Sequence, residues 1–450
     1  MGYFALDTNT TGASNTALGS VSLTANTTGS SNVAVGYTAL DSNTTGNNNT
    51  ALGTFALTAN TAAYYNTALG SASLAANTTG FNNTAVGRQA LSSNTTASNN
   101  TAVGYESLRF NTTGTGSTAN GFQALYSNTT GEWNTSTGYQ SLKANTTGAQ
   151  NTAFGTWGLL SNTTGANNTA SGYQALYSNT TGANNTAVGF SSLYSNTTGG
   201  YQTAAGWKAL TANTTGTQNT AFGSLALTAN TTGNNNVAIG LEALNSNTTS
   251  AGNTAVGTGA AYFATTAGSL VAVGENALRN TTTGTRNVGV GHSAGANSTT
   301  GNSNVSIGYD ANPSSTTVSD QFTLGNSGIS NLRCNDTSIS SLSDERDKAN
   351  IVDIPLGLDF INTLRPVSFD WDRRDGSFVG KKDFGFIAQE LKVAQDATPY
   401  AKSMRLISEE NPEKLEADPM KTFPIMMKAI QELSAMVETL QTEVATLKGA

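Results

Sequence analysis

The residues best equipped for chemistry lie between positions 343 and 348, where the sequence reads Ser-Asp-Glu-Arg-Asp-Lys. A serine hydroxyl is a weak nucleophile until a nearby base removes its proton. Because the only histidine, His292, lies far upstream, Lys348 is the candidate base for Ser343, provided that burial favours its neutral form. Arg346 or backbone N–H groups could stabilise the developing oxyanion. The pattern is compatible with a single-turnover attack of Ser343 on its own carbonyl region, or with an acyl shift through its hydroxyl.

A purely structural role explains the same segment. Ser343, Asp344 and Glu345 also fit a helix N-cap that is followed by an acidic first turn. Spacing alone favours this structural explanation, so the chemical hypothesis depends on the motifs that surround the segment.

Metal and cofactor sites find little support in the sequence. A single histidine leaves no His-rich metal site, and a single cysteine permits no intrachain disulfide. Asp370, Asp372 and Asp375 could bind calcium, but Arg373 and Arg374 lie between them and favour a solvated loop. We therefore predict neither a metal nor a cofactor.

The composition of the chain changes sharply near residue 309. Residues 1–308 carry six acidic and six basic side chains, whereas the remaining 142 residues carry 22 and 15 and account for the net charge of -7. This break indicates a domain boundary. Neither part has the basic stripe that nucleic-acid binding needs. No apolar run approaches the ~20 residues of a membrane span, and the first residues do not resemble a signal peptide.

A seventeen-residue repeat runs through residues 1–308 without a gap. Asparagine begins each copy from Asn9 to Asn247, and three weaker copies begin at Ala264, Thr281 and Ser298. We number the repeat positions 1 to 17 from this asparagine; the unit reads N-T-T-G-x-x-N-T-A-V-G-x-x-A-L-x-x. Such regularity is the signature of a solenoid or of a repeating fibrous prism. We therefore predict a mostly β shaft of eighteen units over residues 1–308.

The unit itself predicts one short strand. Positions 8 to 10 alternate small polar and apolar residues, and the glycine at position 11 and the N-T-T-G segment mark corners. We expect the apolar residue at position 10, such as Leu18 or Ile239, and the leucine at position 15 to point inward. Stacked asparagines should form ladders along the axis. One layer per repeat, at the ~4.8 Å strand spacing, gives a shaft of about 85 Å.

A single chain of this kind would have a thin core. Three chains would bury the apolar stripe better, so we expect a homotrimer, either as a trimeric β-prism or as β-solenoids. The repeat resembles those in the heads of trimeric autotransporter adhesins and in many phage tail-fibre shafts. The chain also begins inside a repeat, because Gly2, Ala5 and Leu6 match the end of a preceding copy. We expect either a fragment or a virion or surface anchoring protein that covers this N-terminal end.

Aromatic residues recur at position 12, directly after the glycine. Aromatic faces can hold sugars, although packing between repeats or between chains is the preferred explanation. The residues are Tyr37, Tyr105, Phe122, Tyr139, Tyr173, Phe190 and Trp207.

The C-terminal part carries several motifs in a recognisable order. The 343–348 segment continues with A-N-I, and L-R-P-V follows at 364–367 and G-F-I-A-Q-E-L at 385–391. Over about residues 320–450 the chain resembles the endosialidase-type intramolecular chaperone domain of phage tailspikes and fibres. The resemblance implies a trimer, assisted folding of the preceding fibre, and then self-cleavage between Ser343 and Asp344. It makes Ser343, Asp344, Arg346 and Lys348 the candidate catalytic residues of a serine-lysine autoprotease.

The end of the chain predicts a coiled coil over residues 423–448. Apolar residues alternate at spacings of three and four, which is the a/d pattern of such a seam. Its members are Phe423, Met426, Ile430, Leu433, Val437, Leu440, Val444 and Leu447. We thus divide the C-terminal part into a β connector over 309–342 and a small α+β chaperone domain over 343–450.

Taken together, the sequence predicts a phage tail fibre of the virion, extracellular and homotrimeric, that attaches to a host glycan or protein receptor. One alternative is a bacterial cell-surface adhesin or matrix filament that carries the same chaperone. Another is a secreted hydrolase whose catalytic domain precedes Met1.

Overall fold

The computed structural model describes residues 2–329, 343–373, 379–409 and 415–449. The chain divides into two compact units, Met1–Leu324 and Gly325–Ala450, and each is described by itself.

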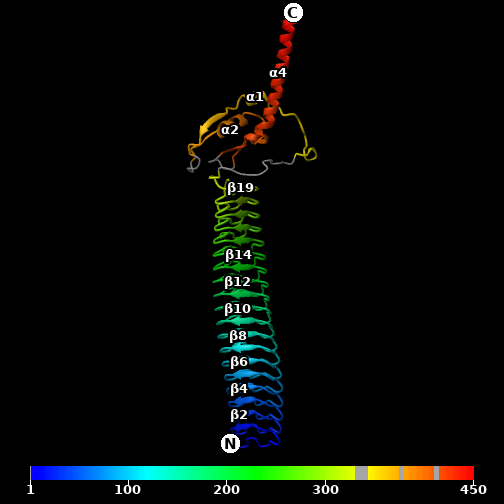
Figure 1. Ribbon diagram of the computed structural model, residues 1–450, viewed down its shortest axis with the longest axis vertical. Coiled ribbons are helices and arrows are strands. Elements are labelled where there is room, and N and C mark those ends of the chain that lie inside the picture. The colour runs from blue at the N-terminus through cyan, green and yellow to red at the C-terminus, as the bar shows by residue number, and fades with distance from the viewer. Residues whose placement is uncertain (1, 330–342, 374–378, 410–414, 450) are drawn as a thin grey trace. The chain divides into compact units, whose positions relative to one another are not determined.

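The first unit is a parallel β-solenoid, as predicted, in which each repeat forms one rung (Figure 1). Every strand occupies repeat positions 8 to 10 and pairs in parallel with the strand seventeen residues further on; Ala17 faces Ala34, for example. A single chain completes each rung, so of the two predicted architectures the solenoid is correct. The strands are β1 (Thr16–Leu18), β2 (Val33–Val35), β3 (Thr50–Leu52), β4 (Thr67–Leu69), β5 (Thr84–Val86), β6 (Thr101–Val103), β7 (Thr118–Asn120), β8 (Thr135–Thr137), β9 (Thr152–Phe154), β10 (Thr169–Ser171), β11 (Thr186–Val188), β12 (Thr203–Ala205), β13 (Thr220–Phe222), β14 (Val237–Ile239), β15 (Thr254–Val256), β16 (Val271–Val273), β17 (Val288–Val290), β18 (Val305–Ile307) and β19 (Phe322–Leu324).

The stack continues beyond the eighteen repeats. Strand β19 pairs with β18 in the same parallel register, so that Val305 faces Phe322 and Ile307 faces Leu324. The solenoid therefore includes the first residues of the segment that we predicted as a connector. Residues 330–342 of that segment lie outside the described part of the chain.

The core of the solenoid consists of alanine and leucine. The leucine at position 15 is fully buried, as predicted, and Leu40 and Leu142 are examples. The prediction for position 10 is wrong, because Leu18 is 56% exposed and Phe222 is 60% exposed. Side chains alternate along a strand, and the central residue of each three-residue strand, which is alanine in most of them, faces the interior. The residues on either side of that central residue must therefore face outward.

The buried leucines adopt a conformation that leucine normally avoids. Leu142 has φ 50°, and the other position-15 leucines have similar values. A left-handed backbone costs a branched or bulky residue about 1 kcal/mol or more. In return, the N–H of Leu142 donates to the carbonyl oxygen of Gly158 on the next rung at 2.9 Å. Burial and rung-to-rung hydrogen bonding thus override the local preference.

A buried ladder of asparagines runs along the axis, as predicted. The Nδ2 of Asn145 donates to Oδ1 of Asn128 at 2.8 Å and to the carbonyl oxygen of Gly148 at 2.9 Å. Its Oδ1 accepts from Nδ2 of Asn162 at 2.8 Å. The ladder ends at Asn247, whose Oδ1 has no partner because the next repeat begins with Ala264.

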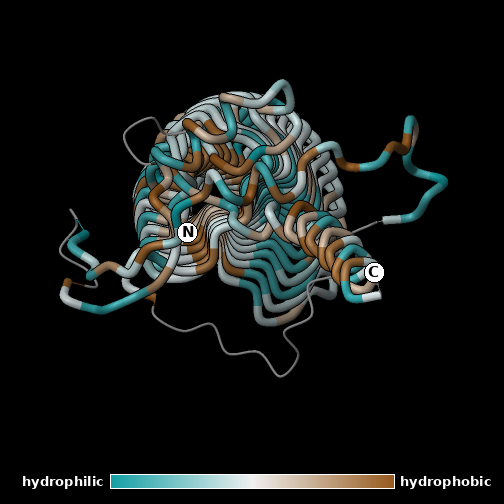
Figure 2. Tube along the Cα trace, turned by 90° about the horizontal axis from the view of Figure 1, so that it is seen from above, coloured by the Kyte–Doolittle hydropathy of each residue, from teal (hydrophilic) through white to brown (hydrophobic). Residues whose placement is uncertain are grey.

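A second asparagine, at position 7, forms hydrogen bonds with the backbone of the corner before the strand. The Nδ2 of Asn49 donates to the carbonyl oxygen of Ala63 at 2.8 Å, and its Oδ1 accepts from the backbone N–H of Asn66 at 3.0 Å. Both asparagine positions thus satisfy backbone groups that the irregular corners would leave unpaired. Viewed along the axis, the rungs superpose and residues of like polarity form continuous bands (Figure 2).

The second unit is a small α+β fold, as predicted. Its core contains Phe360, Leu391, Leu406, Ile407 and Ile425. The strands β20 and β21 pair antiparallel, as do β22 and β23. The elements are η1 (Glu345–Asp347), α1 (Leu358–Ile361), β20 (Val367–Asp370), β21 (Lys382–Gly385), α2 (Ala388–Asp396), α3 (Ala401–Met404), β22 (Ile407–Ser408), β23 (Glu416–Ala417), η2 (Pro419–Thr422) and α4 (Phe423–Gly449).

The predicted terminal helix is present as α4, but only its first part packs on its own unit. Ile425 and Ala429 are buried, and Glu432 accepts a hydrogen bond from the N–H of Leu358 at 2.7 Å. All eight residues of the predicted seam are exposed, Ile430 to 58%. The helix therefore has one face on its own domain and a separate apolar face without a partner in this chain.

The asparagine ladder generates the first prediction. Asn145→Ala should lower the free energy of unfolding by about 3 kcal/mol, because it leaves several buried polar groups unpaired. Asn247→Ala is the matched control and should cost about 1 kcal/mol less, since its Oδ1 accepts no hydrogen bond. Urea unfolding followed by circular dichroism measures the difference. Equal midpoints for the two variants would contradict the ladder's contribution.

Two glycines of the same region generate the second prediction. Gly138, at position 11, has φ 135°, and a Cβ there would lie 2.5 Å from the carbonyl oxygen of Gly155. Gly158 occupies position 14, where most repeats have alanine, and a Cβ would meet nothing closer than 3.7 Å. Gly138→Ala should therefore destabilise the shaft by more than about 1 kcal/mol, whereas Gly158→Ala should stabilise it by about 0.5 kcal/mol. Thermal unfolding midpoints that shift in the same direction would contradict this.

Candidate functional site

The structure brings Ser343 and Lys348 together. The Nζ of Lys348 donates to the Oγ of Ser343 at 2.7 Å and to the carbonyl oxygen of Ser343 at 3.1 Å. The single turn η1 between them reverses the chain, and the N–H of Lys348 closes it on the carbonyl oxygen of Glu345 at 3.0 Å. The predicted nucleophile, base and scissile carbonyl thus form one cluster within six residues.

Asp344 and Arg346 form a second pair in the same turn. Asp344 caps η1, because its Oδ1 accepts from the N–H of Arg346 at 2.9 Å and from Nε at 3.0 Å. These hydrogen bonds lower the pKa of Asp344 and raise the pKa of Arg346. The predicted cap therefore exists, with Asp344 as its acceptor. The guanidinium is engaged by Asp344, and the ammonium of Lys348 contacts the scissile carbonyl instead.

This arrangement can activate a hydroxyl and polarise a carbonyl. A neutral Lys348 can take the proton of Ser343, and a protonated one can donate to the carbonyl oxygen. Lys348 is exposed in the single chain, so the burial that the sequence argument required is not supplied by this chain. A serine that attacks its own carbonyl would also close a four-membered ring. This chain alone therefore supplies neither the burial of Lys348 nor an unstrained attack by Ser343.

Comparison with known proteins gives a match over the segment that contains these residues. Residues 343–398 match the family described as chaperone of endosialidase. This segment is similar to the chaperone-of-endosialidase domain. No curated protein and no solved structure gives a significant match to the chain. The match begins at Ser343, the first residue of the predicted cleavage site, and extends over α1, β20, β21 and α2.

Inside the chaperone domain, an ion pair connects two motifs that are distant in the sequence. The Nε of Arg365, from L-R-P-V, donates to Oε2 of Glu390, from G-F-I-A-Q-E-L, at 2.9 Å. The pair lowers the pKa of Glu390 and raises that of Arg365. Sequence reasoning used both motifs as family marks without finding that they meet. Their opposite charges were the available signal, but the separation of 25 residues gave no indication of contact.

The remaining site predictions concern metals and membranes. In the described parts of the chain, no three His, Cys, Asp or Glu side chains come together as metal ligands would. Asp370 and Asp372 of the acidic loop are described, whereas Asp375 lies outside the described residues. Among the helices that the structure describes, none is long and apolar enough to cross a membrane.

The Asp344 cap generates a third prediction. In a Ser343→Ala chain, Arg346→Gln should raise the pKa of Asp344 toward its usual range of about 3.9, because the three hydrogen bonds from the guanidinium to the carboxylate are lost. Carboxyl chemical shifts followed by NMR through acid titration measure this. Arg365→Gln is the control: it should raise the pKa of Glu390 and leave Asp344 unchanged. If the pKa of Asp344 is the same with and without Arg346→Gln, the interaction between Asp344 and Arg346 is refuted.

Proposed function

We propose that the protein is a homotrimeric tail fibre whose solenoid shaft serves host attachment. Its chaperone domain directs trimer folding and is then released by cleavage between Ser343 and Asp344. The observation that carries the proposal is the uncovered apolar surface of the single chain, on the shaft and on α4. The family of the matched segment implies trimer formation, which gives this surface a partner.

The shaft offers an uninterrupted outward row for contact between copies. Strand positions 8 and 10 hold threonine and apolar residues in most rungs and no charged residue in any of the nineteen strands described. Exposed apolar surface of this extent is rare on monomers and marks an interaction surface. The row repeats once per rung, so a second and a third copy in the same register can cover all of it.

Helix α4 offers a second contact of the same kind. Its predicted seam, from Phe423 to Leu447, is exposed along the whole helix, although Ile425 and Ala429 of another face are buried. Exposed a/d residues over several turns are typical of a coiled coil without its partners. Trimerisation through α4 would join the chaperone domains of three copies.

Cleavage follows from assembly in this proposal. Neighbouring copies bury Lys348, which favours its neutral form, and the hydroxyl of Ser343 in one copy attacks the Ser343 carbonyl of another. The proton passes to Lys348 and then to the departing amine of Asp344. The acyl group is left as an ester on the attacking serine, and water hydrolyses this ester to a free carboxyl. Each bond is cut once.

The receptor is a host cell-surface glycan or protein, and a virion anchoring protein holds the N-terminal end of the shaft. The likeness of the repeat to trimeric autotransporter heads supports a second candidate, a bacterial cell-surface adhesin or matrix filament with the same chaperone. Both candidates share the trimer and the cleavage, and they differ in the anchor.

The test compares purified wild type with Ser343→Ala, Lys348→Ala and Lys348→Arg by intact mass and light scattering. Wild type should yield a trimeric shaft and a fragment of residues 344–450, while every variant stays trimeric and uncut. Arginine keeps the charge of Lys348 but cannot act as a base, so it separates catalysis from folding.

Each of the other outcomes would contradict a different part of the proposal. An uncut wild-type trimer would mean that the C-terminal domain is a permanent trimerisation domain and not an autoprotease. A monomeric wild type would overturn the trimeric fibre. Cleavage in Lys348→Arg would remove Lys348 as the base.

A further inference from the structure

Charged residues in the shaft are confined to a few repeat positions. All charged residues of 1–308 lie at positions 5, 6, 12, 13 and 16, and none lies on a strand. We call positions 12, 13 and 16 the variable face. The charged residues are Asp7, Asp41, Arg88, Glu106, Arg109, Glu132, Lys143, Lys208, Glu242, Glu275, Arg279 and Arg286.

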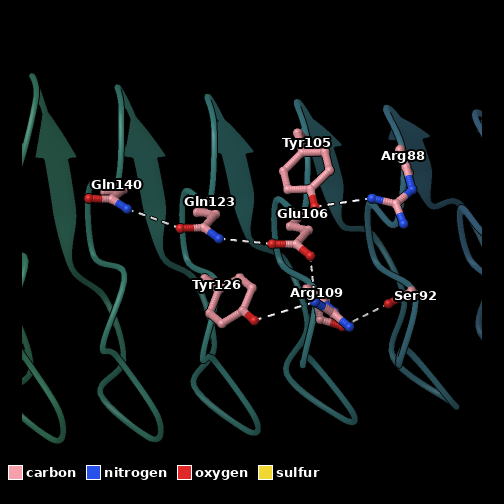
Figure 3. Close-up of polar contacts among 8 residues, drawn as sticks. All are labelled: Arg88, Ser92, Tyr105, Glu106, Arg109, Gln123, Tyr126 and Gln140. Carbon is pink, nitrogen blue, oxygen red and sulfur yellow. Dashed lines mark hydrogen bonds and ion pairs between the residues drawn. The ribbon is translucent and has the colours of Figure 1, made fainter.

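One part of the variable face combines cations with aromatic rings. We define the central patch as Arg88, Tyr105, Arg109, Tyr126 and Lys143. The Nη1 of Arg88 donates to the hydroxyl of Tyr105 at 3.1 Å. The guanidinium of Arg109 and the ammonium of Lys143 each lie 5.9 Å from the centre of the Tyr126 ring. Three cations thus lie within four successive rungs, each against an aromatic ring (Figure 3 shows two of them).

The carboxylate next to the patch, that of Glu106, has its charge balanced by an ion pair. Glu106 is buried and forms an ion pair with Arg109. Its Oε2 also accepts from Nε2 of Gln123 at 2.8 Å, and Gln140 donates in turn to Gln123 at 3.0 Å. These side chains form a row along the axis (Figure 3). The row holds the patch rigid, and the outward charge is set by the exposed Arg88 and by Lys143.

The stacking of the rings decides which ligand chemistry fits. Tyr105, Phe122 and Tyr139 are stacked with centroids 5.3 and 5.2 Å apart and interplanar angles of 10° and 8°. Neighbouring rungs therefore cover the ring faces, and only edges and hydroxyls point outward. A neutral sugar that needs an open aromatic face gains little here, whereas the cations and hydroxyls can bind anionic groups.

We propose that the central patch binds an anionic glycan, whose chain runs along the shaft and whose acidic groups pair with Arg88 and Lys143. The inference rests on the proposed attachment function and supplies the class of its receptor. The strand row is taken up by contact between copies in that proposal, which leaves the variable face for the ligand. Positions of the variable face can change without altering the core, as a receptor-binding surface requires.

The test measures binding of the full chain to polygalacturonate, with neutral dextran as the comparison polymer. Wild type should bind polygalacturonate at low salt, lose affinity as salt rises, and not bind dextran. Arg88→Gln with Lys143→Gln should weaken binding about tenfold, since two exposed charge contacts are lost. Arg279→Gln with Arg286→Gln removes the same charge elsewhere on the shaft and should leave binding within about twofold. Neither pair removes the partner of buried Glu106.

Three results would overturn the inference: no binding to polygalacturonate, equal binding to dextran, or equal loss in both double variants. Light scattering on the same samples reports the trimer independently. A trimer that does not bind refutes the patch alone, whereas a monomer refutes the proposed function.

Discussion

The stacking of each rung on the next is the constraint on which the whole shaft depends. Some backbone groups in the irregular corners pair within their own rung, but most pair with backbone groups of the neighbouring rung, about seventeen residues away. Any insertion would break this register for every layer it separates. The buried asparagines extend the rule to side chains, because each amide bridges two neighbours. A constant repeat length is therefore a physical requirement of the stack.

The same constraint determines which residues are free to vary. Small alanines and one leucine fill the interior of each rung, and glycine takes the corner where a Cβ would meet the next backbone. The outward positions fall into two groups that differ in charge and residue type. The strand row is uncharged and consists of threonine and mostly apolar residues, whereas positions 12, 13 and 16 carry charge and aromatic rings. One chain thus presents two surfaces suited to different partners, one to its own copies and one to a ligand.

The chaperone domain differs from the shaft in how it buries its apolar residues. Its core is small, and much of its apolar surface, including Phe384 and the α4 seam, remains exposed in the single chain. Exposed apolar surface of this kind marks an interaction surface, which the proposed trimer would cover. The Ser343–Lys348 cluster is equally incomplete, since its lysine is exposed and its serine cannot attack its own carbonyl without ring strain. In the proposed function, assembly and cleavage are linked because both need what a neighbouring copy would supply.

The sequence by itself determined the repeat, the short strands at positions 8 to 10, the buried leucines, the asparagine ladder and the terminal helix. The features of the shaft follow from the seventeen-residue periodicity, which acts locally and repeats eighteen times, and the terminal helix follows from its own apolar spacing of three and four. It also singled out Ser343 and Lys348, which lie close enough in sequence for one turn to join them. Only the tertiary structure decided that residues such as Leu18 face outward, because alternation within three residues has two possible phases and packing selects one. Likewise, the Arg365–Glu390 pair and the Glu106 row depend on contacts between distant residues, which no local pattern records.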